Sequence, residues 1–196
     1  MLSALILLRH VAADTDPADR SPSDAPLTNT LPSELSHSAA TPPEVRLTDA
    51  QSRRAWALAD FLQLYSPTAL LAGPGRGCAQ TLAPLASRLD LRVTVAEDLS
   101  PRAPKLPSPA HTAIWTAARA LRALPEPRRT TVVCAETAVL AALLVAVAAC
   151  DGHDLSRYET PIPLGADEAE ALPPGGGWVL HRDDGLLVDV KPLAVR

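Results

Sequence analysis

The feature that most constrains the fold is a nearly continuous apolar run, Leu2 to Leu8, which ends directly in the charged pair Arg9 and His10. A run that is apolar on both faces is typical of a central strand in a parallel sheet covered by helices on both sides. In such sheets, functional groups gather at the carboxyl ends of the strands. The sequence therefore predicts that Arg9 and His10 lie at the edge of a buried sheet where a site can form.

Strand and helix patterns alternate along the rest of the chain. We expect strands over 69–72, 91–95 and 130–135, helices over 48–65, 78–89, 111–124 and 138–149, and a closing hairpin of 177–182 and 186–190 around Asp183, Asp184 and Gly185. Thr48 or Asp49 caps the first helix, and the Asp-Gly turn is a strong hairpin signal. This order predicts an α/β fold: a three-layer α/β/α sandwich with a mostly parallel central sheet, forming one domain over 1–196.

One segment, 13–46, interrupts this pattern. It is crowded with Pro, Ser, Thr and Asp and has neither helical nor strand periodicity. Segments of this length and composition are either loosely packed and disordered or act as lids over a site. The sequence predicts a flexible insertion here and leaves both alternatives open.

The charge balance limits the kinds of partner. The net charge is -4 and the isoelectric point is near 5.7, so the chain lacks the broad basic face that nucleic acids require. Any anion site must be a local pocket with a few positive groups. We therefore expect no nucleic-acid partner.

The cysteines and the apolar stretches indicate the cellular compartment of the protein. Cys78, Cys134 and Cys150 form no CxxC motif and have no histidine at metal-ligand spacing, so buried free thiols in a reducing cytoplasm are expected. The opening apolar run lacks the basic flank of a signal peptide. The run 138–149 is shorter than the roughly 20 residues that span a bilayer. The sequence thus predicts a soluble cytoplasmic protein with no membrane partner.

Five short segments follow one another in a recognisable order. They are LLRHV from Leu7 to Val11, LTDAQ from Leu47 to Gln51, AGPGRGCAQT from Ala72 to Thr81, VVCAE from Val132 to Glu136, and GWVLHRDDG from Gly177 to Gly185. In order and spacing they resemble the histidine phosphatase (phosphoglycerate-mutase-like) superfamily, particularly its short bacterial phosphohistidine phosphatases. The resemblance covers nearly the whole chain except 13–46, and it implies a phosphoglycerate-mutase-like fold.

The resemblance also implies a chemistry. His10 would attack phosphorus and form a phosphohistidine, which divides one difficult displacement into two easier ones. Arg9 and Arg76 would hold the phosphoryl oxygens, because this reaction depends mostly on positioning and electrostatics. The implied substrates are a small phosphoester, a phosphohistidine protein or a nucleotide, and no metal or organic cofactor is implied.

Three positions depart from the family pattern. Val11 stands where the family has glycine, Gly77 stands where it has arginine, with Arg76 one residue early, and Glu136 stands where it has a second histidine. A carboxylate about 4 Å from a phosphoryl group, at an effective dielectric near 20, repels it by roughly 4 kcal/mol. Glu136 could act as a protonated general acid, pair with Arg9, or begin the following helix with its side chain turned away.

Three hypotheses follow. The first is a weakly active phosphatase that uses His10, Arg9, Arg76 and Glu136, with Glu136 as the acid. The second is an inactive relative that binds a phosphorylated ligand or a protein partner, and the third is an unrelated α/β domain in which the Arg-His pair is coincidental. Glu97 lies near where some relatives hold an acidic residue, although an exposed loop carboxylate is the simpler interpretation.

Overall fold

The computed structural model describes residues 1–12, 47–158 and 172–193, and the side chain of Arg76 is not among those described. The insertion predicted over 13–46 lies outside these residues. The elements, in chain order, are β1 (Leu2–Arg9), α1 (Asp49–Leu62), η3 (Gln63–Tyr65), β2 (Ala69–Ala72), α2 (Arg76–Leu89), β3 (Val93–Val95), η4 (Glu97–Leu99), α3 (Pro109–Ala123), β4 (Thr131–Ala135), α4 (Thr137–Cys150), η5 (Leu155–Arg157), β5 (Gly177–Asp183) and β6 (Leu186–Leu193).

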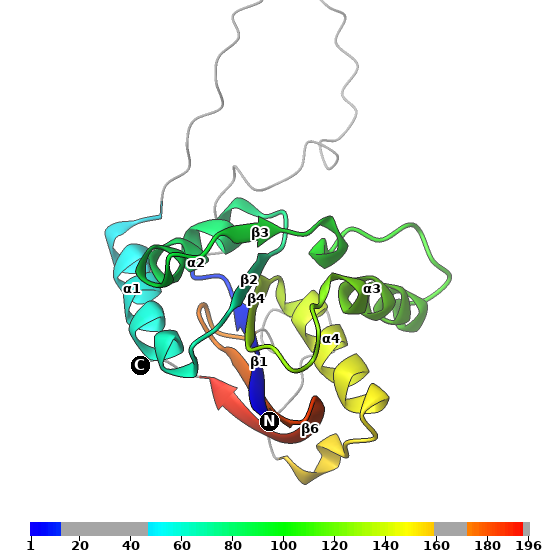
Figure 1. Ribbon diagram of the computed structural model, residues 1–196. Coiled ribbons are helices and arrows are strands. Elements are labelled where there is room, and N and C mark those ends of the chain that lie inside the picture. The colour runs from blue at the N-terminus through cyan, green and yellow to red at the C-terminus, as the bar shows by residue number, and fades with distance from the viewer. Residues whose placement is uncertain (13–46, 159–171, 194–196) are drawn as a thin grey trace, which may run out of the picture.

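The strands form one six-stranded sheet in the order β3-β2-β4-β1-β5-β6. β1, β2, β3 and β4 run parallel to one another. β5 runs antiparallel to β1, and β6 runs antiparallel to β5, with which it forms the closing hairpin. β1 therefore lies in the middle of the sheet, between β4 and β5 (Figure 1). The prediction of a mostly parallel sheet with a buried first strand is confirmed.

Alternate residues of β1 face two separate cores, which defines the three layers. Ile6 and its even-numbered neighbours pack with Leu58 of α1 and Leu82 of α2. Leu5 and Leu7 pack with Ala120 of α3 and with buried apolar residues of α4. Because successive side chains of a strand point to opposite faces, the pairs α1/α2 and α3/α4 cover opposite sides of the sheet (Figure 1).

The helix starts follow from local capping. The Thr48 side chain accepts from the backbone N–H of Gln51 at 3.3 Å, and the Gln51 side chain accepts from the N–H of Thr48 at 2.8 Å, which is a capping box. α3 begins at Pro109, two residues before the predicted start, because Ser108 caps it and proline suits the first turn. α2 likewise begins before its predicted start.

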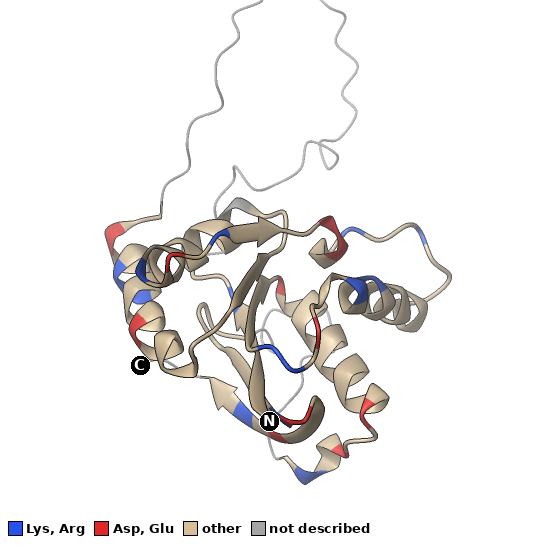
Figure 2. Cartoon of the chain, viewed as in Figure 1, with Lys and Arg blue, Asp and Glu red and all other residues tan. Residues whose placement is uncertain are grey.

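The cysteine prediction is correct for two residues and wrong for the third. All three thiols are free; Cys78 and Cys134 are buried, but Cys150 is exposed at the end of α4. Within the described ranges, no helix combines the length and apolar character needed to cross a bilayer. Basic and acidic residues are interspersed along the described chain (Figure 2).

Candidate functional site

The pairing of β1 with β4 sets the geometry of the site. Arg9 is opposite Ala135 in this parallel pair, so the next residue of each strand, His10 and Glu136, emerges at the same edge of the sheet. β2 ends at this edge as well, next to Cys134. The turn after β2 leads into α2, so four elements meet where the sequence predicts a site.

His10 contacts Glu136 directly. The Nε2 atom of His10 lies 3.3 Å from each of the two carboxylate oxygens. The imidazole side chain is only 5% exposed, and the carboxylate side chain is 35% exposed. The Nδ1 atom is buried and has no hydrogen-bond partner among the described residues. Glu136 is thus the polar group on the outer side of the imidazole.

Gly77, in the first turn of α2, lies against the side of the His10 imidazole that carries Nδ1. A Cβ atom built on Gly77 would lie 3.2 Å from Nδ1 of His10 and 3.1 Å from the Cβ of Ala12. Contacts this short leave little room for a side chain, so glycine allows the first turn of α2 to pack on the imidazole. Gly77 stands where the family has arginine, and here its backbone packs directly on His10.

Opposing effects act on the pKa of His10. Burial lowers the pKa of His10, while the hydrogen bond and negative charge of Glu136 raise it. Cys78 also raises this pKa, and the positive charge of Arg9 lowers it. The net effect is a pKa above the ordinary value near 6.5. His10 therefore keeps its positive charge to a higher pH than a free histidine does.

The raised pKa predicts a pH-dependent loss of stability for Glu136→Gln. A raised folded-state pKa stabilises the protein fully below the unfolded-state value, and this contribution disappears as the pH rises through the folded-state pKa. The substitution should lower the free energy of unfolding by up to about 1 kcal/mol near pH 5.5, since the carboxylate is partly exposed, and by much less near pH 9. Urea unfolding at both pH values measures this.

Glu97→Gln is the matched control, because Glu97 is an exposed carboxylate with no imidazole contact among the described residues. Its effect should not change between the two pH values. A loss for Glu136→Gln that grew with pH would contradict the assigned direction.

Arg9 is fixed by the segment that precedes β5. Its Nη1 donates to the carbonyl of Leu172, its backbone N–H donates to the carbonyl of Gly176 at 2.8 Å, and its own carbonyl accepts from Gly175 at 3.2 Å. The side chain is buried. Arg9 is therefore held in place beside His10, with part of its guanidinium bound to backbone.

Arg76, the second predicted anion-binding residue, begins α2 and precedes Gly77. Its side chain lies outside the described part of the structure, so its role as a phosphate clamp stays a prediction.

The structure contradicts one of the three roles that the sequence left open for Glu136. Glu136 occupies the N-cap position of α4, but its side chain makes no capping hydrogen bond. It contacts His10 instead. The interpretation in which the side chain turns away from the site is wrong, because the β1–β4 register brings the carboxylate against the imidazole.

Val11 and Thr81 connect the end of β1 to α2. The backbone N–H of Val11 donates to Oγ1 of Thr81 at 3.1 Å, and this hydroxyl donates to the carbonyl of Gly77 at 2.7 Å. The Val11 N–H is therefore already used, and its side chain is buried in the core. The sequence interpretation did not assign Thr81 a role, although the residue stands in the motif from Ala72 to Thr81.

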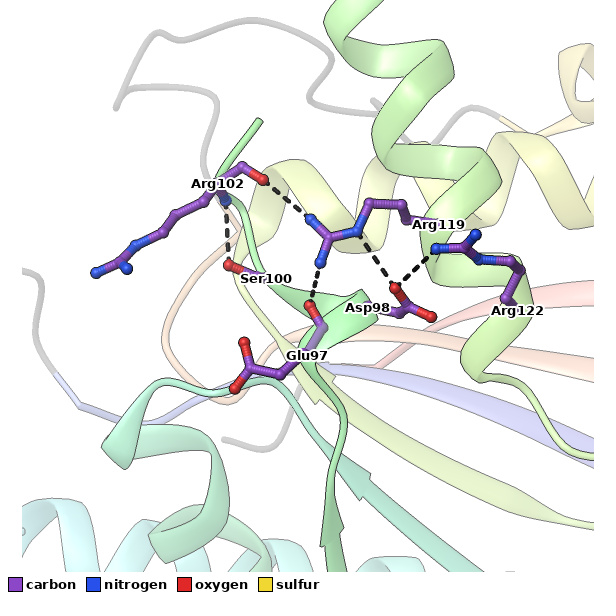
Figure 3. A network of polar contacts seen from close by, with 6 residues as sticks. All are labelled: Glu97, Asp98, Ser100, Arg102, Arg119 and Arg122. Atoms are coloured by element: carbon purple, nitrogen blue, oxygen red, sulfur yellow. Dashed lines mark hydrogen bonds and ion pairs between the residues drawn. The ribbon is translucent and has the colours of Figure 1, made fainter. Parts of the chain in front are cut away.

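Glu97 is not part of this site. Its backbone carbonyl accepts from Arg119 at 2.5 Å, while its exposed carboxylate points away from the neighbouring polar cluster (Figure 3). Asp98 is the acidic member of that cluster: hydrogen bonds from Arg122 and Arg119, at 3.0 and 3.3 Å, lower the pKa of Asp98. These contacts join η4 to α3, and Glu97 is an exposed carboxylate, as the simpler interpretation held.

The charges of the site suit an anion better than a cation. His10 and Arg9 bring positive charge to the edge of the sheet, with Glu136 as the negative group. Among the residues that the structure describes, no group of three or more His, Cys, Asp or Glu side chains is placed to hold a metal ion. The arrangement can offer a nucleophilic nitrogen, a positive charge and an acid–base carboxyl group.

Comparisons with known proteins identify the fold. No protein-family model matches the chain, and no curated protein has a significantly similar sequence. Among solved structures, mycobacterial glucosyl-3-phosphoglycerate phosphatase is similar, with 16% identity and a TM-score of 0.55 over 98% of this chain and 97% of that one. YhfR of Bacillus stearothermophilus has 14% identity and a TM-score of 0.58, over 95% and 94% of the two chains.

A third similar structure is a protein from Agrobacterium tumefaciens provisionally assigned as phosphohistidine phosphatase SixA. It has 18% identity and a TM-score of 0.53, and the match covers 99% of both chains. These likenesses extend over nearly the full length of each chain. The chain has the phosphoglycerate-mutase-like fold that the resemblance implies, and it shares this fold with these three proteins.

Proposed function

We propose that this chain is a weakly active histidine-type phosphatase that acts on a small phosphoester, a phosphohistidine or a nucleotide through a phosphohistidine at His10. The observation that carries the proposal is the imidazole at the carboxyl end of β1, in contact with Glu136. The fold supports it, because the similar mycobacterial phosphatase was solved with inorganic phosphate and with VO3. Both ligands have the charge and shape of a phosphoryl group.

The proposed first step begins with a proton transfer from Nε2 of His10 to the Glu136 carboxylate across the 3.3 Å contact. The free electron pair of Nε2 then forms a bond to phosphorus as the bond to the leaving oxygen breaks. Glu136, now a carboxylic acid, gives its proton to that oxygen. Water later attacks the phosphohistidine, releases phosphate and restores the histidine, with Glu136 accepting the proton of the water.

The same contact accounts for weak activity. Before the proton moves, Nε2 is occupied by Glu136 and carries the proton of a cation with a raised pKa. The carboxylate also repels the incoming phosphoryl group by an amount of the order of 4 kcal/mol. His10 can therefore attack phosphorus only after this proton has left Nε2.

The blocked nucleophile also favours a second candidate function, binding of a phosphorylated ligand or a phosphohistidine protein without turnover. In that case vanadate should raise the melting temperature by mass action, while no phosphate is released from an aryl phosphate. The phosphatase proposal expects the rise in melting temperature with vanadate together with release of phosphate from the aryl phosphate.

We also propose that 1–196 forms one domain that works in the cytoplasm. Pairing of β1 with β5 joins the two ends of the described chain in one sheet. The three cysteines are free thiols, which supports a reducing compartment.

The test is to trap the intermediate. Protein mixed with excess para-nitrophenyl phosphate and quenched in base should gain one phosphoryl group, and peptide mass spectrometry should locate it on His10. His10→Gln, which keeps a similar size without a nucleophilic nitrogen, should show neither the adduct nor phosphate release above background. Phosphate release that persists in His10→Gln, or an adduct on another residue, would contradict the proposal.

A further inference from the structure

A pocket lies at the end of the sheet opposite His10. Arg182, near the end of β5, is opposite Ser3 at the beginning of β1, whereas His10 follows the other end of that strand. The pocket has a volume of about 270 Å³ and is lined by Arg182 and by residues from the C-terminal ends of α3 and α4. It shares no residue with the candidate active site.

Arg182 is the charged group of this pocket. Arg182 is 6% exposed, and its Nε atom is buried and has no hydrogen-bond partner among the residues that the structure describes. Within the described residues, no carboxylate lies within the 4.0 Å of an ion pair from this guanidinium. A buried guanidinium that lacks an acceptor is costly, so an acceptor from outside the chain would complete its hydrogen bonds.

A local irregularity accompanies this position. The pairing of β5 with β6 shifts register between His181 and Arg182. Bulges of this kind re-aim side chains and recur beside binding sites. Arg182 is therefore deeply buried, lines the pocket and lies next to an irregularity in the strand pairing.

The remaining walls define what kind of acceptor fits. Leu121, Leu124 and Pro125 form an apolar wall, with Val147 from α4 beside it. Asp151 also lines the pocket, but its Oδ2 atom already accepts from the backbone N–H of Leu187 at 3.0 Å. Among the described residues, the buried polar atom of this pocket that lacks a partner is a donor, the Nε of Arg182, so the complementary ligand is an anion with an apolar body.

We propose that this pocket binds a small carboxylate with an apolar body, whose oxygens accept from Arg182 and whose hydrocarbon part packs against Leu124 and Val147. A planar guanidinium and a carboxylate match in geometry and charge. The volume is slightly below that of pockets that hold drug-sized molecules. It therefore suits a ligand of the size of benzoate.

The experiment uses benzoate as the probe and benzamide, which has the same shape without the charge, as the control ligand. Calorimetric titration of the full chain should give a Kd on the order of 1 mM or tighter for benzoate, and at least tenfold weaker binding for benzamide. Arg182→Met should weaken benzoate binding at least tenfold. Asp151→Asn, which keeps an oxygen for the Leu187 N–H but removes the competing charge, should tighten it severalfold.

Cys150 gives a readout at the pocket itself. It lines the pocket, and it is the exposed one of the three cysteines, so iodoacetamide should alkylate it first. Saturating benzoate should slow this alkylation severalfold, whereas benzamide should not. His10→Gln should leave both measurements unchanged, which separates this inference from the proposed phosphatase activity.

The proposal would be overturned if benzamide bound as tightly as benzoate, or if benzoate did not bind at concentrations up to the order of 10 mM. It would also be overturned if Arg182→Met bound benzoate undiminished, or if Asp151→Asn bound it more weakly. Circular dichroism checks that each variant is folded. If Arg182→Met does not fold, Asp151→Asn and the Cys150 protection still decide the outcome.

Discussion

Replacing Glu136 with histidine is expected to raise the rate of phosphate release by about 10²–10³-fold, the scale on which one anion-stabilising donor changes a rate. The substitution removes the carboxylate that contacts Nε2 of His10 and adds an imidazole that can donate to a phosphoryl oxygen. The substitution removes no capping hydrogen bond from α4, so its cost in stability is that of the lost contact with His10. Initial rates with para-nitrophenyl phosphate at pH near 7 measure the change.

Two controls separate the contributions. Glu136→Gln removes the charge without adding an imidazole. Its rate of phosphate release depends on whether the lost repulsion outweighs the lost proton acceptor, and this rate should stay well below that of Glu136→His. Glu136→His combined with His10→Gln should return to background, since the gain requires the nucleophile. An unchanged rate in Glu136→His would show that the carboxylate does not limit the reaction.

Replacing Gly177 with alanine is expected to be the most damaging single-methyl change in the described chain. A Cβ atom there would lie 1.8 Å from the carbonyl oxygen of Leu7, and both partners are backbone in the β1–β5 pair. Neither can yield without breaking ladder hydrogen bonds. We expect a loss of at least about 3 kcal/mol in the free energy of unfolding, which lowers Tm by roughly 6–12 °C for a chain of this size.

Gly152→Ala is the matched control. Gly152 has a positive φ of 64°, yet nothing lies within 4 Å of its Cβ position. Its substitution tests conformational strain alone, which costs about 1 kcal/mol. Thermal unfolding of Gly177→Ala and Gly152→Ala compares the steric clash with backbone strain. A similar loss of unfolding free energy in both variants would mean that the β1–β5 contact is not as close as described.

The architecture could be predicted because its signals are local. The run from Leu2 to Leu8 is apolar on both faces, and in the structure each face packs on a different helix pair. The start of α1 after its N-cap residue Thr48 follows from side-chain capping within a few residues. The position of His10 at the end of β1 needed nothing beyond these patterns.

The site could be predicted only in part, because its decisive contact joins residues that are far apart in sequence. Glu136 meets His10 through the register that sets Arg9 opposite Ala135, and no local pattern specifies a register between distant parallel strands. The pocket around Arg182 was not predicted for the same reason. In the sequence, Arg182 is simply a polar residue in an alternating hairpin strand.

The central position of β1 has a consequence for biosynthesis. Leu5 pairs with Thr131 on one side and with Leu180 on the other, so both partners leave the ribosome long after β1 does. Until then the long apolar run of β1 has no neighbouring strand in the nascent chain. Sheets closed by such distant pairings form slowly and expose aggregation-prone intermediates. Translation of this protein should therefore depend on chaperones that bind extended apolar segments.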